Sequence, residues 1–360
     1  MHSFACPACG SLLFFENSRC LACGSEVGYR RDTASFALPD AQLGGCARRF
    51  GSGCNWLAWS GAPGGLCDCC ALLRVPPPDD ETAAAAWARA AAAARRLVHQ
   101  LDGLRLPVIG RDVDPQGGLA FDLRHGTPSD PVVIGHRDGV ITIDLAEGDD
   151  GYREGLRVRL AEAYRTLLGH FRHEVGHWYW TMLVADTPAL WGFRSLFGDE
   201  RLDYSAALSE HYAGEPPPDW VQRHVSVYAT AHPWEDWAET FAHYLHIRDA
   251  LQTAAAFGVV VAGPDLDTPP SPEAPLASVP LEDPPDDFDE IVKTWLPLTF
   301  ALNQVNRSMG RRDLYPFLLA PAVIEKLRFV HRLVRDCDRQ SDPVPPPGQF
   351  LAAALGTAVP

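Results

Sequence analysis

The sequence predicts a mostly helical α+β fold with a small β-sheet, preceded by a cysteine-rich module. Nine of the ten cysteines lie within the first 70 of the 360 residues, which sets this part of the chain apart. Most later segments repeat apolar residues at spacings of three and four, as helices do, and one segment has two runs of β-branched residues about a turn signal. With 46% apolar residues, the chain is able to bury a substantial core.

The predicted module, residues 1–75, begins with two matched cysteine pairs. Cys6 and Cys9 form one Cys-x-x-Cys knuckle, Cys20 and Cys23 form another, and a glycine follows each of them. Four thiolates at these spacings are able to close a tetrahedral structural zinc site. A redox-active pair is the alternative, but two matched pairs favour zinc.

Five more cysteines follow in the same module. Cys67 and Cys70 repeat the knuckle spacing, and Cys46 and Cys54 are candidates to complete a second zinc site. Buried free thiols are the alternative for this looser set, and Cys69 is left over. Six arginines and five acids nearly balance in the module, so it lacks the basic surface that nucleic acid requires. We expect a protein as the module's partner, if it has one.

The segment RVPPPDDE, residues 74–81, marks the start of a second domain that we expect to extend over residues 80–336. The sequence ETAAAAWARAAAAARRLVHQL follows directly and predicts a helix, because alanine and arginine have high helix propensity. Residues 131–147 contain two β-branched runs about Asp138 and Gly139, which predicts a β-hairpin.

Two long helical patterns follow the hairpin. Apolar residues recur at three and four from Tyr152 to Leu183, which predicts one helix over this range. A second pattern runs from Trp234 to Leu251, and Pro233 suits the first turn of that helix.

The last part of the chain begins with a proline-rich insertion. Residues 263–287 contain eight prolines, seven acids and no lysine or arginine. This little apolar surface does not offset the entropy of ordering, so we expect a mobile insertion. Helical patterns then cover residues 287–309 and 320–336, and we expect a loosely ordered tail over residues 337–360.

The helix predicted to end at Leu183 carries the motif HEVGH. His173 and His177 are four residues apart, so both lie on one helical face and are able to ligate one ion. Glu174 lies about 100° round the helix, beside such an ion, where it suits the general base of a zinc-activated water. Two histidines on a helix more often have a structural role, so a third ligand decides between these interpretations.

Candidates for the third ligand lie in and near YATAHPWEDWAETFAHYLHI, residues 228–247. Glu235 and Glu239 are four residues apart among large apolar residues, where acids need a partner. Four histidines are further candidates, each with a structural role as its alternative: His211, His232, His243 and His246.

HEVGH followed by two such glutamates resembles zinc hydrolases of the gluzincin type. The resemblance implies that Glu235 is the third zinc ligand. It also implies that Glu239 hydrogen-bonds one of the motif histidines, and the reverse assignment of the two acids is the alternative. Tyr228 precedes Glu235 by seven residues, which resembles lethal-factor-like metalloproteases, where such a tyrosine stabilises the oxyanion. A core tyrosine is the alternative for Tyr228.

Together with the cysteine knuckles, the segments HEVGHWYW, FGDERLDYSAALSEHY and HPWEDWAETFAHYLH resemble a bacterial family described as putative zinc-binding metallopeptidases. The resemblance spans residues 1–336 apart from the insertion. It implies a zincin-like metallopeptidase that hydrolyses peptide or protein substrates, with one catalytic zinc ion and one or two structural ones. In such proteases an edge strand pairs with the substrate, and residues 139–145 are the candidate. One further set of residues is assigned to an internal ion-pair cluster rather than to the active site: Asp199, Glu200, Arg201 and Asp203.

Composition excludes several classes of partner. The formal net charge of −15 repels phosphate backbones, so we expect no nucleic-acid partner. No apolar stretch approaches the about 18 residues of a membrane span, and no leader is evident, so we expect a cytoplasmic protein without membrane contact. Two other functions stay open: a non-catalytic zinc-binding scaffold, and a zinc amidase that acts on small amides.

Overall fold

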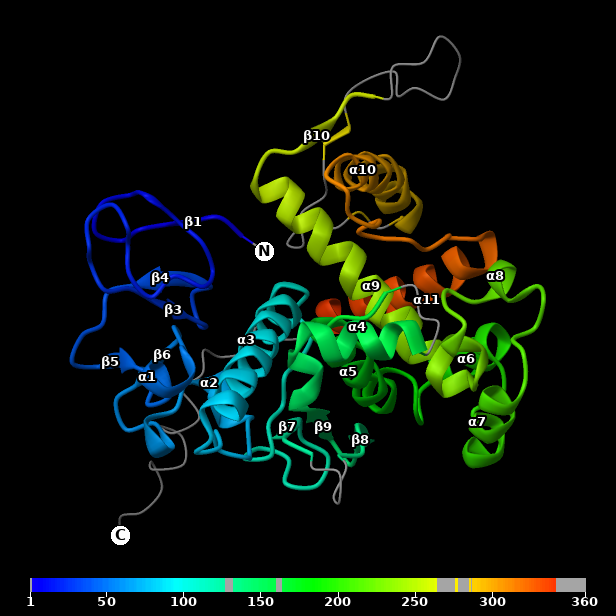
Figure 1. The fold of residues 1–360 in the computed structure, drawn as a ribbon, viewed down its shortest axis with the longest axis horizontal. Coiled ribbons are helices and arrows are strands. Elements are labelled where there is room, and N and C mark those ends of the chain that lie inside the picture. The colour runs from blue at the N-terminus through cyan, green and yellow to red at the C-terminus, as the bar shows by residue number, and fades with distance from the viewer. Residues whose placement is uncertain are drawn as a thin grey trace.

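The computed structural model describes residues 2–126, 132–159, 164–263, 276–277, 285 and 287–340. It is a mostly helical α+β fold with small sheets and an N-terminal cysteine-rich module, which confirms the predicted fold class. The module lies at one side of the molecule, the long helix α3 (Glu81–Gly103) adjoins it, and the helices that follow α3 in the chain lie beyond it (Figure 1).

The N-terminal module is built from short antiparallel hairpins and single helical turns. Its elements are β1 (Phe4–Ala5), β2 (Leu12–Leu13), β3 (Gly28–Arg30), β4 (Ser35–Ala37), β5 (Leu43–Gly45), α1 (Arg49–Ser52), β6 (Leu57–Trp59), the 3-10 turn η1 (Pro63–Gly65) and α2 (Asp68–Ala71). β1 pairs with β2, β3 with β4 and β5 with β6. Such short strands bury little surface, so other forces must hold the module together.

The module is fixed to α3 by buried polar contacts. The Tyr29 hydroxyl lies 2.8 Å from His99 Nδ1, and both side chains are buried. Arg31 donates two hydrogen bonds of 2.8 Å to the carboxylate of Asp102. α3 itself begins as the sequence predicts, because Asp80 caps it by accepting a hydrogen bond from Ala83 N–H. The module is therefore packed onto the helical body.

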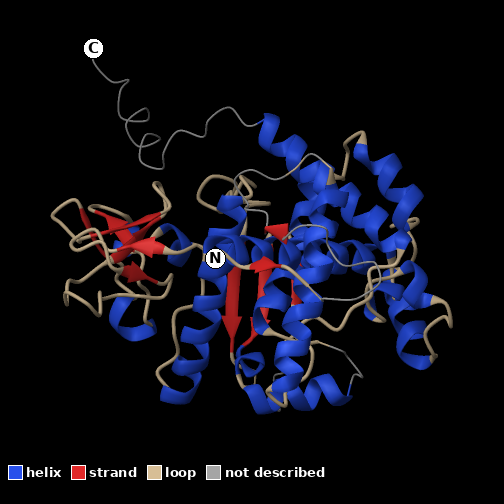
Figure 2. Ribbon diagram, turned by 90° about the horizontal axis from the view of Figure 1, so that it is seen from above, coloured by secondary structure: helices blue, strands red, loops and turns tan. Residues whose placement is uncertain are grey.

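A three-stranded sheet stands among the helices (Figure 2). Its order is β7 (Ala120–Arg124), β9 (Val140–Asp144) and β8 (Gly135–Arg137), with β7 parallel and β8 antiparallel to β9. Asp138 (φ 49°) and Gly139 (φ 79°) form the turn between β8 and β9, which confirms the predicted hairpin.

The prediction that residues 139–145 form an edge strand is wrong. The strand in this range, β9, lies in the centre of the sheet, because β7 pairs with it along residues 120–124. No strong sequence signal marks β7, and this unrecognised strand covers the side of β9 that was expected to be open. The edge next to the HEVGH helix is β8, which pairs with β9 on one side.

The prediction of one helix from Tyr152 to Leu183 is also wrong. The structure has two helices, α4 (Asp150–Arg159) and α5 (Leu167–Leu183), and residues 160–163 lie outside the described part. Thr166 has an extended backbone and caps α5 by accepting a hydrogen bond from Gly169 N–H. Apolar spacing does not detect such a cap, because it continues unchanged through the break.

The helix predicted from Trp234 is α9 (Pro233–Ala256), with Pro233 in its first turn. α9 packs along α5 at close range. A Cβ added to Gly176, the glycine of HEVGH, would lie 3.2 Å from both Ala238 Cα and Phe241 Cβ. The Trp237 indole N–H also donates to the Gly176 carbonyl at 2.8 Å. This close packing places the first turns of α9 beside the HEVGH motif.

The remaining elements complete the body around α5 and α9. They are the 3-10 turns η2 (Leu145–Gly148) and η3 (Tyr228–Thr230), the helices α6 (Ala189–Phe197), α7 (Tyr204–Ala213), α8 (Trp220–Arg223), α10 (Phe288–Ser308) and α11 (Pro321–Gln340), and the strands β10 (Val260–Val261) and β11 (Leu276–Ala277). α10 and α11 confirm the last two predicted helices. No helix of the described residues has the length and hydropathy of a membrane span.

Two predictions concern segments that are largely outside the described residues. Most of the proline-rich insertion, residues 264–275, 278–284 and 286, lies outside them, and so do residues 341–360 of the predicted tail. The first four residues of that tail, 337–340, belong to α11 and are helical rather than loosely ordered.

Candidate metal centres

The first two cysteine knuckles meet in space. The sulfur atoms of Cys6, Cys9, Cys20 and Cys23 all lie within 4.8 Å of one another. Cys6 Sγ lies 3.8 Å from Cys23 Sγ, and Cys9 Sγ lies 3.7 Å from Cys20 Sγ, without a disulfide. Cys9 and Cys23 are exposed, so this cluster is at the surface of the module. Four unbonded sulfurs in one cage fit a tetrahedral zinc ion.

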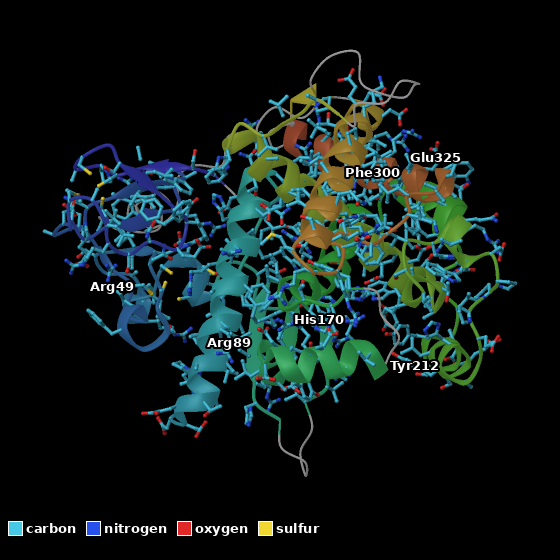
Figure 3. All side chains as sticks on the ribbon, turned by 45° about the horizontal axis from the view of Figure 1, so that its top comes forward. Arg49, Arg89, His170, Tyr212, Phe300 and Glu325 are labelled. Atoms are coloured by element: carbon cyan, nitrogen blue, oxygen red, sulfur yellow. The ribbon has the colours of Figure 1, made fainter. Side chains whose placement is uncertain are left out.

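The second cluster combines Cys46, Cys54, Cys67 and Cys70, all of which are buried. Cys54 Sγ lies 3.7 Å from Cys67 Sγ and 3.6 Å from Cys70 Sγ. The backbone N–H of Cys67 points to Cys46 Sγ at 3.4 Å, as expected for a knuckle that supports thiolates. Cys69 is buried but does not belong to this cluster. Figure 3 shows sulfur atoms both at the outer edge of the module and on its side toward α3.

The third cluster joins α5 and α9. His173 Nε2 and His177 Nε2 lie 3.0 Å and 3.5 Å from Glu235 Oε2. That oxygen is buried, and no protein group in the described part of the chain makes a suitable hydrogen bond to it. Two imidazole nitrogens and a carboxylate oxygen that converge on one point fit the donor set of zinc. An ion held by all three would give the orphaned oxygen its partner.

The structure separates the roles of the two glutamates on α9. His173 Nδ1–H donates to Glu239 Oε1 at 2.8 Å, and the Ser226 hydroxyl donates to Glu239 Oε2 at 2.6 Å. Burial raises the pKa of Glu239, but its contact with His173 outweighs burial and lowers the pKa to about 2. Both oxygens of Glu239 are therefore occupied, and its carboxylate fixes the ring of His173 so that Nε2 faces Glu235.

Glu174 has the environment of a base. It is 8% exposed, and its Oε2 atom is buried without a hydrogen-bond partner among the described residues. Burial raises the pKa of Glu174 above its ordinary value, although the nearby His173 and His177 oppose this shift. A buried carboxylate with a free oxygen and a raised proton affinity is suited to accept a proton.

Two tyrosines adjoin the cluster, and the sequence identified only one of them. The ring of Tyr228, in η3, lies 5.9 Å from the ring of His173. The hydroxyl of Tyr204, the first residue of α7, donates to Glu235 Oε1 at 2.7 Å. Burial and the Glu235 carboxylate raise the pKa of Tyr204, so its hydroxyl stays a donor at neutral pH. Tyr204 lies within the segment GDERLDY, but no spacing rule connects it to Glu235.

Two more aromatic neighbours were also missed. The indole of Trp234 stacks on the ring of His177 with centroids 5.0 Å apart. The ring of His136, on β8, is 6.5 Å from the ring of His177 on another side. Sequence spacing cannot reveal either contact, because β8, α5 and α9 meet only in the folded chain.

The other predicted candidates do not join the cluster. Each of the four further histidines has a structural contact: His211 Nδ1 lies 3.3 Å from Thr230 Oγ1, His232 caps α9, His243 Nδ1 lies 2.7 Å from the Tyr315 hydroxyl, and His246 Nδ1 lies 3.0 Å from Arg172 Nη1. The acids of GDERLDY have structural roles too. Asp199 pairs with Arg201 at the surface, Glu200 pairs with Arg194, and Asp203 caps α7, so these residues are structural but do not form the single internal ion-pair cluster that was expected.

Comparisons with known proteins find relatives over nearly the whole chain. The chain is 49% identical over 347 residues to an uncharacterized protein of Mycobacterium bovis and to uncharacterized proteins of two strains of Mycobacterium tuberculosis. Each alignment covers 95% of this chain and 98% of the relative. No solved structure matches the chain.

Two family matches divide the chain. Residues 3–81 match a zinc-ribbon domain, and these residues contain both cysteine clusters. Residues 83–333 match the family described as "Putative zinc-binding metallo-peptidase", and they contain the His–His–Glu cluster. The second match spans more than half of the chain, so the protein belongs to this zinc-binding metallo-peptidase family and carries a zinc-ribbon domain before the matched region.

Proposed function

We propose that this protein is a zinc-dependent metallopeptidase whose catalytic ion is held by His173, His177 and Glu235. The carrying observation is the buried Glu235 Oε2, which faces both histidine Nε2 atoms and makes no hydrogen bond within the described residues. A zinc ion in this position supplies a Lewis acid that lowers the pKa of water and polarises a substrate carbonyl.

Glu174 and Tyr228 have separate roles in the reaction. Glu174 accepts a proton from the attacking water through Oε2, which has no hydrogen-bond partner in the described part of the chain, and passes it to the leaving amine. Its burial and raised pKa support this role. The Tyr228 hydroxyl donates a hydrogen bond to the oxyanion that forms at the substrate carbonyl. Its position beside His173 supports this role, and burial raises its pKa, so the hydroxyl keeps its proton.

The rival scaffold function requires a closed metal site with a fourth protein ligand. Within the described ranges, the third cluster has three such residues, whereas each cysteine cluster has four. His243 and His246, two of the histidines considered as ligands, contact Tyr315 and Arg172 instead. This difference favours a catalytic centre on α5 and α9, and two structural zinc ions in the module. A zinc amidase would share the centre, and a peptide-library cleavage screen separates it from a peptidase.

Metal content per chain tests the proposed centre. We expect about three zinc ions in the reduced wild-type protein and about two in His177→Ala, because only the third cluster loses a ligand. Elemental analysis measures the ratio, and a circular-dichroism spectrum checks that the fold is kept. An equal zinc content in both proteins would rule out the proposed catalytic ion and favour the scaffold.

We propose β8 as the strand that binds an extended peptide or protein substrate. β8 is at the sheet edge beside α5, and its His136 ring lies near His177. In a hairpin with a two-residue turn, the residues that flank the turn exchange hydrogen bonds, so the N–H of His136 faces away from β9. An N–H that points outward from an edge strand is the group to which a substrate backbone would bond.

A comparison of His136→Pro with His136→Ala tests whether the edge strand β8 binds the substrate. Both variants lose the imidazole, but only proline removes the outward N–H. We expect His136→Pro to lower kcat/KM for peptides by about tenfold relative to His136→Ala, the loss of roughly one hydrogen bond, with zinc still bound. Equal kcat/KM for the two variants would remove β8 from substrate binding.

A further inference from the structure

Glu235 is held by two different sets of contacts, one on each carboxylate oxygen. Oε2 faces the two histidine nitrogens. Oε1 accepts the hydrogen bond of 2.7 Å from the Tyr204 hydroxyl. Because Glu235 is 1% exposed, water has little access to take the place of that hydroxyl. The hydrogen bond from Tyr204 therefore restrains the orientation of the Glu235 carboxylate.

The caps of two helices, Asp203 on α7 and His232 on α9, fix the position of Tyr204. Asp203 caps α7 by accepting a hydrogen bond from Ala206 N–H, which sets the backbone of the next residue, Tyr204. His232, the cap of α9, accepts from Trp234 N–H through Nδ1 and reaches the Leu202 carbonyl through Nε2 at 3.1 Å.

These contacts also connect the starts of the two helices. The ring of Tyr204 packs edge-on against the ring of His232, with centroids 5.4 Å apart. The start of α7 is thus held against the start of α9, three residues before Glu235.

We infer that Tyr204 is the positioning residue of the catalytic metal centre, and that its hydroxyl holds Glu235 in the orientation that ligates zinc. The inference rests on the proposed His–His–Glu centre. It gives Tyr204 a different role from Tyr228, although the two tyrosines are neighbours. Tyr204 acts on metal binding through Glu235, whereas Tyr228 acts on the substrate during the reaction.

The solvent exposure of α7 supports this interpretation. None of its ten residues is buried, so it contributes little to the core. Tyr204 itself is 42% exposed, yet its hydroxyl reaches the buried carboxylate. Tyr204→Phe keeps the ring and removes only the hydroxyl, so we expect the fold to tolerate it.

The test measures zinc affinity, so it does not depend on a known substrate. The full chain is treated with a chelator until only the cysteine clusters keep zinc, and the third site is then titrated with zinc against a competing chromophoric chelator. Groups that orient a metal ligand typically change metal affinity by 10–100-fold. We therefore expect Tyr204→Phe to weaken zinc binding at the third site by about 10–100-fold.

Two controls accompany the test. Tyr212→Phe, on the same exposed helix, should bind zinc as tightly as the wild type. In a Glu235→Ala background, adding Tyr204→Phe should weaken binding no further, because the residue through which Tyr204 acts is gone. Cobalt substitution gives a second readout, since its visible absorption follows the geometry of the ligands.

The outcomes distinguish the positioning role of Tyr204 from the proposed metal centre itself. Wild-type affinity and an unchanged cobalt spectrum in Tyr204→Phe would overturn the positioning role but leave the metal centre in place. Equal weakening in Tyr212→Phe or in the Glu235→Ala background would also overturn it. A wild-type chain that takes up no zinc beyond its cysteine clusters would instead overturn the proposed function.

Discussion

Glu174→Gln is expected to lower the rate of peptide hydrolysis by about 10²–10⁴-fold, the usual contribution of a general base. Glutamine has nearly the same shape as glutamate but does not accept a proton at neutral pH. Because Glu174 stands beside the cluster and is not one of its three converging residues, the zinc content should stay unchanged. The measurements are kcat/KM on a cleaved library peptide and zinc per chain.

Glu210→Gln is the matched control, since Glu210 is an exposed glutamate on α7. It makes the same change in charge without touching the centre, and it should hydrolyse peptides at the wild-type rate. Hydrolysis by Glu174→Gln at the native rate would refute the assignment of Glu174 as the general base. Loss of zinc from Glu174→Gln would show that this side chain holds the ion rather than activating water.

Cys70→Ser is expected to unfold the N-terminal module and to destabilise the helical body. Its sulfur belongs to the cluster whose four cysteines are all buried. Zinc binding at such sites contributes on the order of 10–16 kcal/mol of folding free energy, more than the short hairpins provide alone. The body is affected because Arg48 donates to the Cys70 carbonyl and its guanidinium lies 5.0 Å from the ring centre of Trp87 on α3.

Cys69→Ser is the control for this prediction. Cys69 is equally buried, and burial raises its pKa to about 12, so it stays a neutral thiol outside the four converging sulfurs. The serine hydroxyl in this place should cost roughly 1–3 kcal/mol and leave the zinc content intact. Thermal unfolding and elemental analysis measure both effects. If Cys70→Ser and Cys69→Ser have the same melting temperature and zinc content, the buried cluster does not hold a structural metal.

Local signals were sufficient where the fold follows from local chemistry. Asp138 and Gly139 adopt the positive φ angles that a two-residue hairpin needs, and Pro233 lies in the first turn of α9. The spacing of Cys6, Cys9, Cys20 and Cys23 likewise reflects a constraint that a single ion imposes on short loops.

Local signals failed where a distant segment changes the outcome. β9 was expected at an edge, but the strand β7 covers it, and nothing within residues 139–145 records that pairing. The helix break before Leu167 depends on the Thr166 cap, which the spacing of apolar residues does not reveal. The partner of Glu235 Oε1 is Tyr204, which is 31 residues away in the sequence.

The amino-acid pattern was enough to name the candidate donors: two sets of four cysteines, the HEVGH histidines and a pair of glutamates on a later helix. Spacing along one helix or one loop sets those relations, because the backbone geometry of each element is local. The folded chain was needed to show that Glu235 rather than Glu239 faces both Nε2 atoms, and that Tyr204 contacts its other oxygen. The choice depends on the packing of α9 against α5 at Gly176 and on the docking of α7, which are contacts between segments that no sequence period encodes.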